Sequence, residues 1–251
     1  MRAIQAPMGI LVAVAVVLAA CAKDAQTDEQ IGTKTAGGEV STSISGDAAD
    51  KKGMALVRVV NAVPALKGLT VRSDDTNSLP SVDYKKVSAY QPIDNNWVKF
   101  EVGDQPTGSF APMETNREML TDGYRYTMVV MPSNDGNGYT SRIVRDELSD
   151  DQTKVYLRVI HAAPDLDEIN VVAKGGETLF DGINFKSEAG FKEVAPWSGT
   201  LEFRTEDDKR LVGTLPNVAL RAGTSYTVVV TRDKGGKLAP IWFEDQPMAG
   251  R

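Results

Sequence analysis

After residue 53 the hydrophobic and polar residues follow the spacing of β-strands and not that of helices. Residues 98–102 read Val-Lys-Phe-Glu-Val, the strict alternation of a strand with one buried face. Residues 55–60 and 155–160 are runs rich in β-branched side chains, and each is followed by a turn that contains proline. No long amphipathic helical pattern occurs in this part of the chain. The pattern therefore predicts an all-β structure.

Two hairpins are expected from the turn chemistry. Residues 126–131 and 139–144 flank the loop 133–138, Ser-Asn-Asp-Gly-Asn-Gly, whose residues tolerate positive φ angles. A similar pattern returns about one hundred residues later. Its strands are expected at 226–231 and 238–243, around the loop 233–237.

Two segments of the chain occur twice, and this repeat determines the predicted domain organisation. Val-Arg-Val-Val-Asn-Ala-Val-Pro at 57–64 returns as Leu-Arg-Val-Ile-His-Ala-Ala-Pro at 157–164. The segment 120–130 returns in the same way at 220–230. Repetition at a fixed spacing is the signature of duplicated structural units.

We therefore expect two domains of one topology, at residues 54–149 and 152–247. Each is predicted to be an antiparallel β-sandwich, immunoglobulin-like with Greek-key connections, although a partly open barrel is an alternative that the pattern leaves open. In a sandwich of this kind, a tyrosine hydroxyl often ties down a turn, and Tyr126 and Tyr226 stand at matching places for that role.

The repeated segments carry a family resemblance. Residues 158–165 and 222–229 resemble the two signature segments of the domain-of-unknown-function 4397 family. The resemblance implies an exported bacterial protein with a duplicated domain. It implies no catalytic residue, because the family has no established activity. The first copy departs from the pattern by having Asn61 where the second has His161.

The N-terminal segment is typical of a bacterial lipoprotein signal. An apolar run at residues 9–18 leads into Leu18-Ala19-Ala20-Cys21, and this run is too short to cross a bilayer comfortably. We expect residues 1–20 to be removed as a signal peptide and Cys21 to carry the lipid, with Ala22 directing the protein to the outer membrane. A plain membrane anchor and an ordinary secretory signal are the alternatives. Residues 21–53 are expected to form the lipidated cysteine and a disordered tether, because almost no large apolar residue follows Cys21 there.

Charge and residue counts exclude several classes of function. The net charge of −6 opposes binding to nucleic acid, which requires a basic surface. The chain has one cysteine, so it has no internal disulfide, and one histidine, His161, so a two-histidine zinc site cannot form. No Gly-x-Ser-x-Gly motif is present to hold a serine nucleophile. We expect no catalytic residue, no metal and no cofactor.

Polar residues that attract attention also have structural interpretations. Asn61 and His161 are expected to hydrogen-bond the turns beside Pro64 and Pro164. Loop carboxylates are expected to be solvated surface charge, with weak calcium binding or a hydrolytic carboxylate pair as the alternatives. They form three clusters: Asp74 with Asp75, Asp150 with Asp151, and Asp165 with Asp167 and Glu168.

Tryptophan offers the one indication of a ligand-binding surface. Trp97 and Trp197 fall near the same connection in the two copies, where aromatic rings could stack on sugars or anchor a protein partner. The alternative is that each ring caps the core of its sandwich. The leading functional hypothesis is a lipid-anchored, non-enzymatic binding or adhesion module of the cell envelope. A structural spacer or surface-layer component is the runner-up, and a hydrolase using loop carboxylates comes last.

Overall fold

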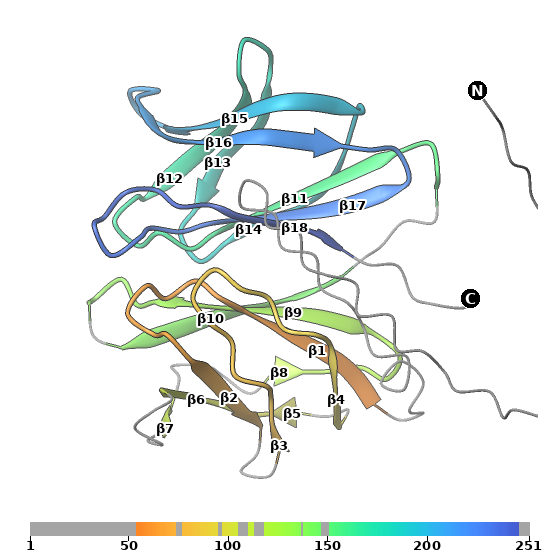
Figure 1. Ribbon diagram of the computed structural model, residues 1–251, viewed down its shortest axis with the longest axis vertical. Coiled ribbons are helices and arrows are strands. Elements are labelled where there is room, and N and C mark those ends of the chain that lie inside the picture. The colour runs from red at the N-terminus through yellow and green to blue at the C-terminus, as the bar shows by residue number, and fades with distance from the viewer. Residues whose placement is uncertain are drawn as a thin grey trace, which may run out of the picture. The chain divides into compact units, whose positions relative to one another are not determined.

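The computed structural model describes residues 54–73, 77–94, 97–104, 110–112, 118–136, 138–146 and 151–245. Every helix or strand within these residues is a β-strand, which confirms the predicted all-β class (Figure 1). The described part of the chain contains no helix of the length and apolarity that a membrane crossing requires. The predicted signal peptide, Cys21 and the tether lie outside the described residues.

The first repeat contains two four-stranded sheets, ordered β10-β9-β1-β4 and β3-β2-β6-β7, and a short ribbon of β5 and β8. Its strands, coloured orange to green in Figure 1, are β1 (Met54–Asn61), β2 (Leu69–Ser73), β3 (Asn77–Ser78), β4 (Gln91–Asp94), β5 (Trp97–Val98), β6 (Phe100–Asp104), β7 (Phe110–Pro112), β8 (Glu118–Met119), β9 (Arg125–Pro132) and β10 (Tyr139–Arg145).

The second repeat has the matching arrangement, with sheets ordered β14-β11-β17-β18 and β13-β12-β15-β16. Its strands, coloured green to blue, are β11 (Val155–His161), β12 (Glu168–Ala173), β13 (Thr178–Asn184), β14 (Glu188–Val194), β15 (Trp197–Thr205), β16 (Leu211–Leu220), β17 (Thr224–Val230) and β18 (Ile241–Asp245).

The registers of the two repeats agree, as the sequence repeat predicts. Val57 pairs with Tyr126 in the first repeat, and Leu157 pairs with Tyr226 in the second. These two strand pairs are parallel, whereas the sequence predicted antiparallel sheets throughout. In each repeat the chain crosses to the second sheet and returns on one side of the first strand as an antiparallel strand, β4 or β14. It then crosses again and returns on the other side in the same direction as the first strand. Such a crossover is what a parallel pair requires.

One strand boundary also differs from the prediction. Residues 238–243 were expected to form the last strand of the second repeat, but β18 begins at Ile241. Leu238 makes only an isolated bridge with Arg232, and Pro240 has no N–H group to donate to a ladder. The corresponding strand of the first repeat, β10, covers its predicted range.

Hydrophobic side chains form a separate core in each sandwich and a third cluster shared by both. The two sandwich cores draw only on their own repeats. The shared cluster contains Val60, Ala62, Val87, Val129, Met131, Val144, Ile160, Ala162, Val229, Ile241 and Phe243. The sheets β10-β9-β1-β4 and β14-β11-β17-β18 thus bury apolar side chains against each other. Because β1 and β11 are covered on both faces, their sequences are largely hydrophobic and not alternating, apart from Arg58 and Arg158.

Candidate functional site

Asn61 and His161 hold equivalent turns at the ends of β1 and β11. The Asn61 Oδ1 atom accepts a hydrogen bond from the Val63 backbone at 2.9 Å, and its Nδ2 atom donates to the Leu66 carbonyl at 3.1 Å. In the second repeat, His161 Nδ1 accepts from the Ala163 backbone at 3.3 Å and Nε2 lies 3.0 Å from the Leu166 carbonyl. The structural interpretation of both residues is confirmed.

His161 is unsuited to proton transfer in this position. Its side chain is fully buried, and burial lowers its pKa to about 4. Both ring nitrogens are occupied by the turn, with the proton on Nε2, because that atom faces a carbonyl oxygen. Phe185 meets the ring edge to face, at a centroid distance of 6.0 Å. The imidazole therefore remains neutral and structural at ordinary pH.

The two tyrosines predicted to tie down turns do so. Thr121 donates its backbone N–H to the Tyr126 hydroxyl at 3.1 Å, and Arg221 donates to the Tyr226 hydroxyl at 3.2 Å. Each bond fixes the turn that leads into a central strand, β9 or β17.

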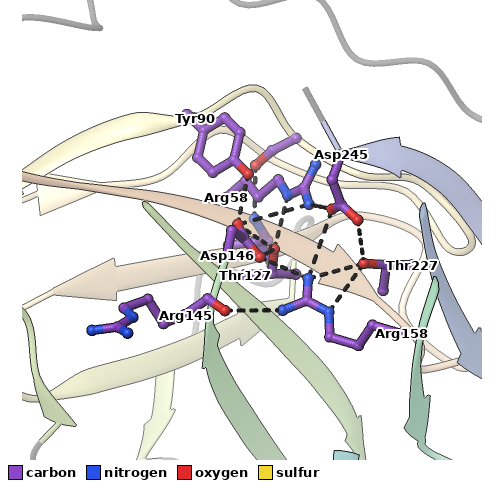
Figure 2. A network of polar contacts seen from close by, with 10 residues as sticks. Arg58, Tyr90, Thr127, Arg145, Asp146, Arg158, Thr227 and Asp245 are labelled. Carbon is purple, nitrogen blue, oxygen red and sulfur yellow. Dashed lines mark hydrogen bonds and ion pairs between the residues drawn. The ribbon is translucent and has the colours of Figure 1, made fainter. Parts of the chain in front are cut away.

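The most extensive polar network is a buried ion cluster between the repeats, formed by Arg58, Asp146, Arg158 and Asp245 (Figure 2). Arg158 Nη2 lies 2.7 Å from Asp146 Oδ1, so the arginine of the second repeat pairs with the aspartate of the first. Arg58 makes the reciprocal pair with Asp245. The side chains of all four residues are at most 1% exposed. The exchange is reciprocal, as in the contact of a two-fold symmetric dimer.

Threonines on the neighbouring strands complete this cluster. Arg58 Nε donates to Thr127 Oγ1 at 2.9 Å, and Arg158 Nε donates to Thr227 Oγ1 at 3.1 Å. Tyr90 adds a hydrogen bond of 2.6 Å to Asp146, which has no counterpart in the second repeat because Phe191 stands at the matching position. A second asymmetry is that Arg158 Nη1 donates to the Arg145 carbonyl at 3.2 Å, whereas the buried Arg58 Nη1 atom has no hydrogen-bond partner among the described residues.

The arginines decide the ionisation of the buried carboxylate. Burial alone would raise the pKa of Asp146, but the charges of Arg58 and Arg158 outweigh it and hold that pKa below its usual value. Burial raises the pKa of the neighbouring Tyr90 well above its ordinary value, so its hydroxyl remains a donor. The cluster therefore pairs each buried guanidinium group with a carboxyl group of the other repeat.

Trp197 lines a small apolar groove at the rim of the second sandwich. The groove has a volume of about 200 Å³ and is formed by Ala173, Gly176, Glu177, Leu179, Val194, Ala195, Pro196, Trp197 and Leu220. The indole lies against Gly199, where an added Cβ would come within 2.5 Å of the ring. One side of the ring packs against the sandwich core, and the groove leaves another part accessible. The capping interpretation therefore holds for Trp197, and ligand binding by its accessible part stays a prediction.

Trp97 is placed differently, although it follows the same connection in the first repeat. Its side chain is 55% exposed and stands opposite Met119, which is 62% exposed. Strand pairing shows which residues correspond: Val102 pairs with Val71, and Phe203 pairs with Val171, so Val102 and Phe203 occupy the same place in the two repeats. Trp97 lies five residues before Val102. The residue five before Phe203 is Ser198, so Trp97 corresponds to Ser198 and not to Trp197. A displacement of one residue along a strand moves a side chain to the opposite face. Trp97 is not among the residues that line the Trp197 groove.

The acidic residues that the structure describes either border an open hollow or pair with neighbouring groups. Asp165, Asp167 and Glu168 border an open hollow of about 440 Å³, together with Glu206 and Asp207. Asp165 pairs with Arg232, and Asp151 accepts hydrogen bonds from Thr153. Within the described ranges, no three acidic, cysteine or histidine side chains are grouped to hold a metal ion. Asp74, Asp75 and Asp150 lie outside those ranges.

Sequence comparison supplies the family. The family model described as "Domain of unknown function (DUF4397)" matches residues 55–172 and 155–250. The chain belongs to this family. The two overlapping matches agree with the two repeats of the DUF4397 fold seen in the structure. No curated protein matches the sequence.

Two solved structures are similar to parts of this DUF4397 protein. The C-terminal domain of AlgF from P. aeruginosa is 26% identical, and the match covers 37% of this chain and 99% of that domain with a TM-score of 0.29. A protein from Bacteroides fragilis, described as a candidate cell adhesion protein, is 11% identical. That match covers 73% of this chain and 84% of the other, with a TM-score of 0.20. At such scores neither likeness bears on function.

Sequence reasoning missed the ion cluster. The signal was present, because an arginine interrupts an otherwise apolar strand at the same place in both repeats, Arg58 and Arg158. A charged residue in a strand buried on both faces requires a partner. The partners could not be identified, because Arg58 and Asp245 are 187 residues apart in the chain.

Proposed function

We propose that this DUF4397 protein is a lipid-anchored component of the bacterial cell envelope that binds a glycan without catalysing its conversion. The observation that carries the binding function is the Trp197 groove. An accessible indole beside a carboxylate, Glu177, offers a stacking face for a sugar ring and an acceptor for its hydroxyl groups. A groove of about 200 Å³ accommodates a single ring and not the surface of a folded protein.

The lining residues support binding over hydrolysis. Glycoside hydrolysis requires a pair of carboxyl groups on either side of the scissile bond. Glu177 is the one carboxylate among the residues that line the Trp197 groove. A site of this composition can orient a sugar but has no second acid or base for its cleavage.

Anchoring rests on the Leu18–Cys21 signal and is tested separately from binding. Cys21→Ser should release the protein from the membrane fraction and abolish the mass increase due to acyl chains. Recovery of the wild-type protein in the outer-membrane fraction is expected. A Cys21→Ser protein that remains in membranes would contradict lipid anchoring, but this result would not test the proposed glycan site.

Binding is tested with a panel of oligosaccharides and purified peptidoglycan. Glu177→Gln and Trp197→Ala should each reduce retention on the ligand that the wild type selects. Trp97→Ala is the matched control, because that ring lies outside the Trp197 groove. Since Trp197 also packs on the core, Glu177→Gln is the decisive variant, as Glu177 is exposed and its loss does not affect packing. Equal retention of Glu177→Gln and the wild type would remove this site from consideration.

The contact between the repeats favours a second candidate, a structural spacer. The buried ion cluster and the shared hydrophobic cluster join the two sandwiches, and a spacer requires such fixed contacts between its domains. A protein that is membrane-bound through Cys21 but retains no glycan in any assay would favour this role.

A further inference from the structure

A second groove, distinct from that of Trp197, follows the free edge of β16. It has a volume of about 690 Å³, within the range of about 300–1,000 Å³ that is common for ligand sites. Its first wall is the continuous segment 211–216, and its second wall is the segment 237–240 together with Lys85 and Asp233. Neighbouring residues of a strand point to opposite faces. A groove lined by six consecutive residues therefore runs along the backbone edge of the strand and not over one face.

The backbone at this edge is available for pairing. Among the described residues β16 is the last strand of its sheet and pairs on one side, with β15. Leu238 packs against Gly213 and forms the floor beneath the groove. Pro216, and Asn217 with a φ of 59°, end the regular edge. Residues 211–215 thus form a five-residue edge, which is the usual length of a strand, with a β-bulge at Val212 where the pairing with β15 shifts by one residue.

This edge lacks the charges that normally protect a sheet from further pairing. Residues 211–215 read Leu-Val-Gly-Thr-Leu, and Leu211 is 46% exposed. Edge strands usually carry charged side chains that oppose strand addition. The other edges of the described sheets that have five or more residues do so. Their exposed or half-exposed charged residues are Arg142 and Arg145 in β10, Asp181 in β13, Glu188, Lys192 and Glu193 in β14, and Glu244 in β18.

The second wall of the groove is complementary to an anion. Lys85 and Lys237 line it, and no described ion pair neutralises either ammonium group. Burial lowers the pKa of Lys85, which is the effect of a half-buried cation with too little compensating charge. Asp233 is the one acid in this lining. Its charge partly offsets the effect of burial on the pKa of Lys85, and its Oδ1 atom accepts hydrogen bonds from the backbone of Gly235 and Lys237 within its own loop.

We propose that residues 211–215 accept an extended acidic peptide as an additional β-strand, with a carboxylate of the peptide placed against Lys85 and Lys237. The backbone of β16 would supply the affinity, and the lysines would select the charge. This binding requires neither the lipid anchor nor the Trp197 groove.

The test uses the full chain and a synthetic fluorescent hexapeptide, Thr-Val-Glu-Val-Thr-Val, in an anisotropy titration. We expect saturable binding and new hydrogen-exchange protection of the amides of residues 211–215. Replacing the peptide glutamate by lysine should weaken binding about tenfold or more. Methylation of the backbone nitrogens of the peptide that would face β16 should abolish binding, because a methylated nitrogen has no hydrogen to donate to the strand.

Protein variants locate the site. Lys85→Gln and Lys237→Gln should each weaken binding of the glutamate peptide by about tenfold. Lys186→Gln is the matched control, because Lys186 has the same left-handed backbone (φ 61° against 64° for Lys85) but does not line this groove. Thermal melts establish that the variants fold.

Four results would overturn the proposal. They are the absence of saturable binding to the wild type, equal binding of the N-methylated peptide, unchanged binding by both groove variants, and full hydrogen-exchange protection of the amides of residues 211–215 before any peptide is added.

Discussion

At the scale of single residues, the two repeats solve the same problem with different side chains. Asn61 and His161 make equivalent hydrogen bonds to their turns, one through an amide and the other through a ring. Two properties separate them. Only the imidazole can take up a proton, and the Asn61 amide also donates a hydrogen bond to the Val82 carbonyl at 2.9 Å. The structure therefore predicts a pH dependence that belongs to the second repeat alone.

We expect His161→Asn to fold and to lose part of the pH dependence of stability. In the wild type the pKa of His161 falls from about 6.5 in the unfolded chain to about 4 in the folded protein. Between these values the unfolded state binds more protons, so the free energy of unfolding rises with pH, by up to about 3 kcal/mol, and is constant above pH 6.5. Urea titrations from pH 4 to 8 measure this slope.

The asparagine variant should have a flatter profile over the same range. Asp146 does not interfere, because its lowered pKa places its loss of stabilisation below pH 4. His161→Ala should be less stable than His161→Asn at pH 7, since alanine leaves the buried Ala163 N–H without its partner. Identical slopes in the wild type and His161→Asn would show that the histidine does not titrate as described.

The sequence predicts residue roles well where the partner is local. Tyr126 and Tyr226 bond to a backbone group five residues earlier, and Asn61 and His161 bond to atoms two and five residues later. Such contacts follow from the turn itself. The pairing of Arg58 with Asp245 depends instead on how two complete sandwiches pack, and no local pattern encodes it.

At the scale of strands, the repeated sequence predicts the sheets but not every register. The hairpins and the matching order of strands follow from the alternation and the repeat. The difference between Trp97 and Trp197 does not, because a displacement of one residue leaves the composition of a strand unchanged while it reverses which side chains are buried.

A glycine in β16 shows how closely a strand and a loop can pack, and it provides an element-scale prediction. Gly213→Ala should lower the free energy of unfolding by about 1–3 kcal/mol, because the new Cβ would lie 2.6 Å from Leu238, a member of the second sandwich core. Gly190→Ala in β14 is the control, since no atom lies within 4 Å of the Cβ it would add. Chemical denaturation compares the two. Equal stability of both variants would contradict the close approach of Leu238 to β16.

At the scale of the whole described unit, the ion cluster decides how the repeats depend on each other. Arg158→Met should destabilise the protein by about 3–5 kcal/mol, because it removes the nearest cation from the buried Asp146. Tyr90→Phe should cost only about 1 kcal/mol, since it deletes one hydrogen bond and reproduces Phe191 of the second repeat.

The control for Arg158 is another ion pair between the repeats. Arg142 lies 3.5 Å from Glu188, with its side chain 45% exposed, so Arg142→Met should change stability by less than about 1 kcal/mol. Equal effects of Arg158→Met and Arg142→Met in urea denaturation would show that burial does not govern the contact. That residues 54–149 and 152–247 each fold alone stays a prediction. Each repeat alone would expose its part of the shared hydrophobic cluster to water.

The reciprocal exchange of aspartates has a consequence for how such a chain can arise and diverge. In two separate identical subunits, each substitution at this contact would appear twice, and association would depend on concentration. Within one chain the partners are held at an effective concentration in the millimolar range, so a weak contact persists. Each half can then vary independently. The repeats differ in this way at two matching positions, where Tyr90 corresponds to Phe191 and Asn61 corresponds to His161. Two identical subunits could not differ at these positions, whereas two repeats of one chain can.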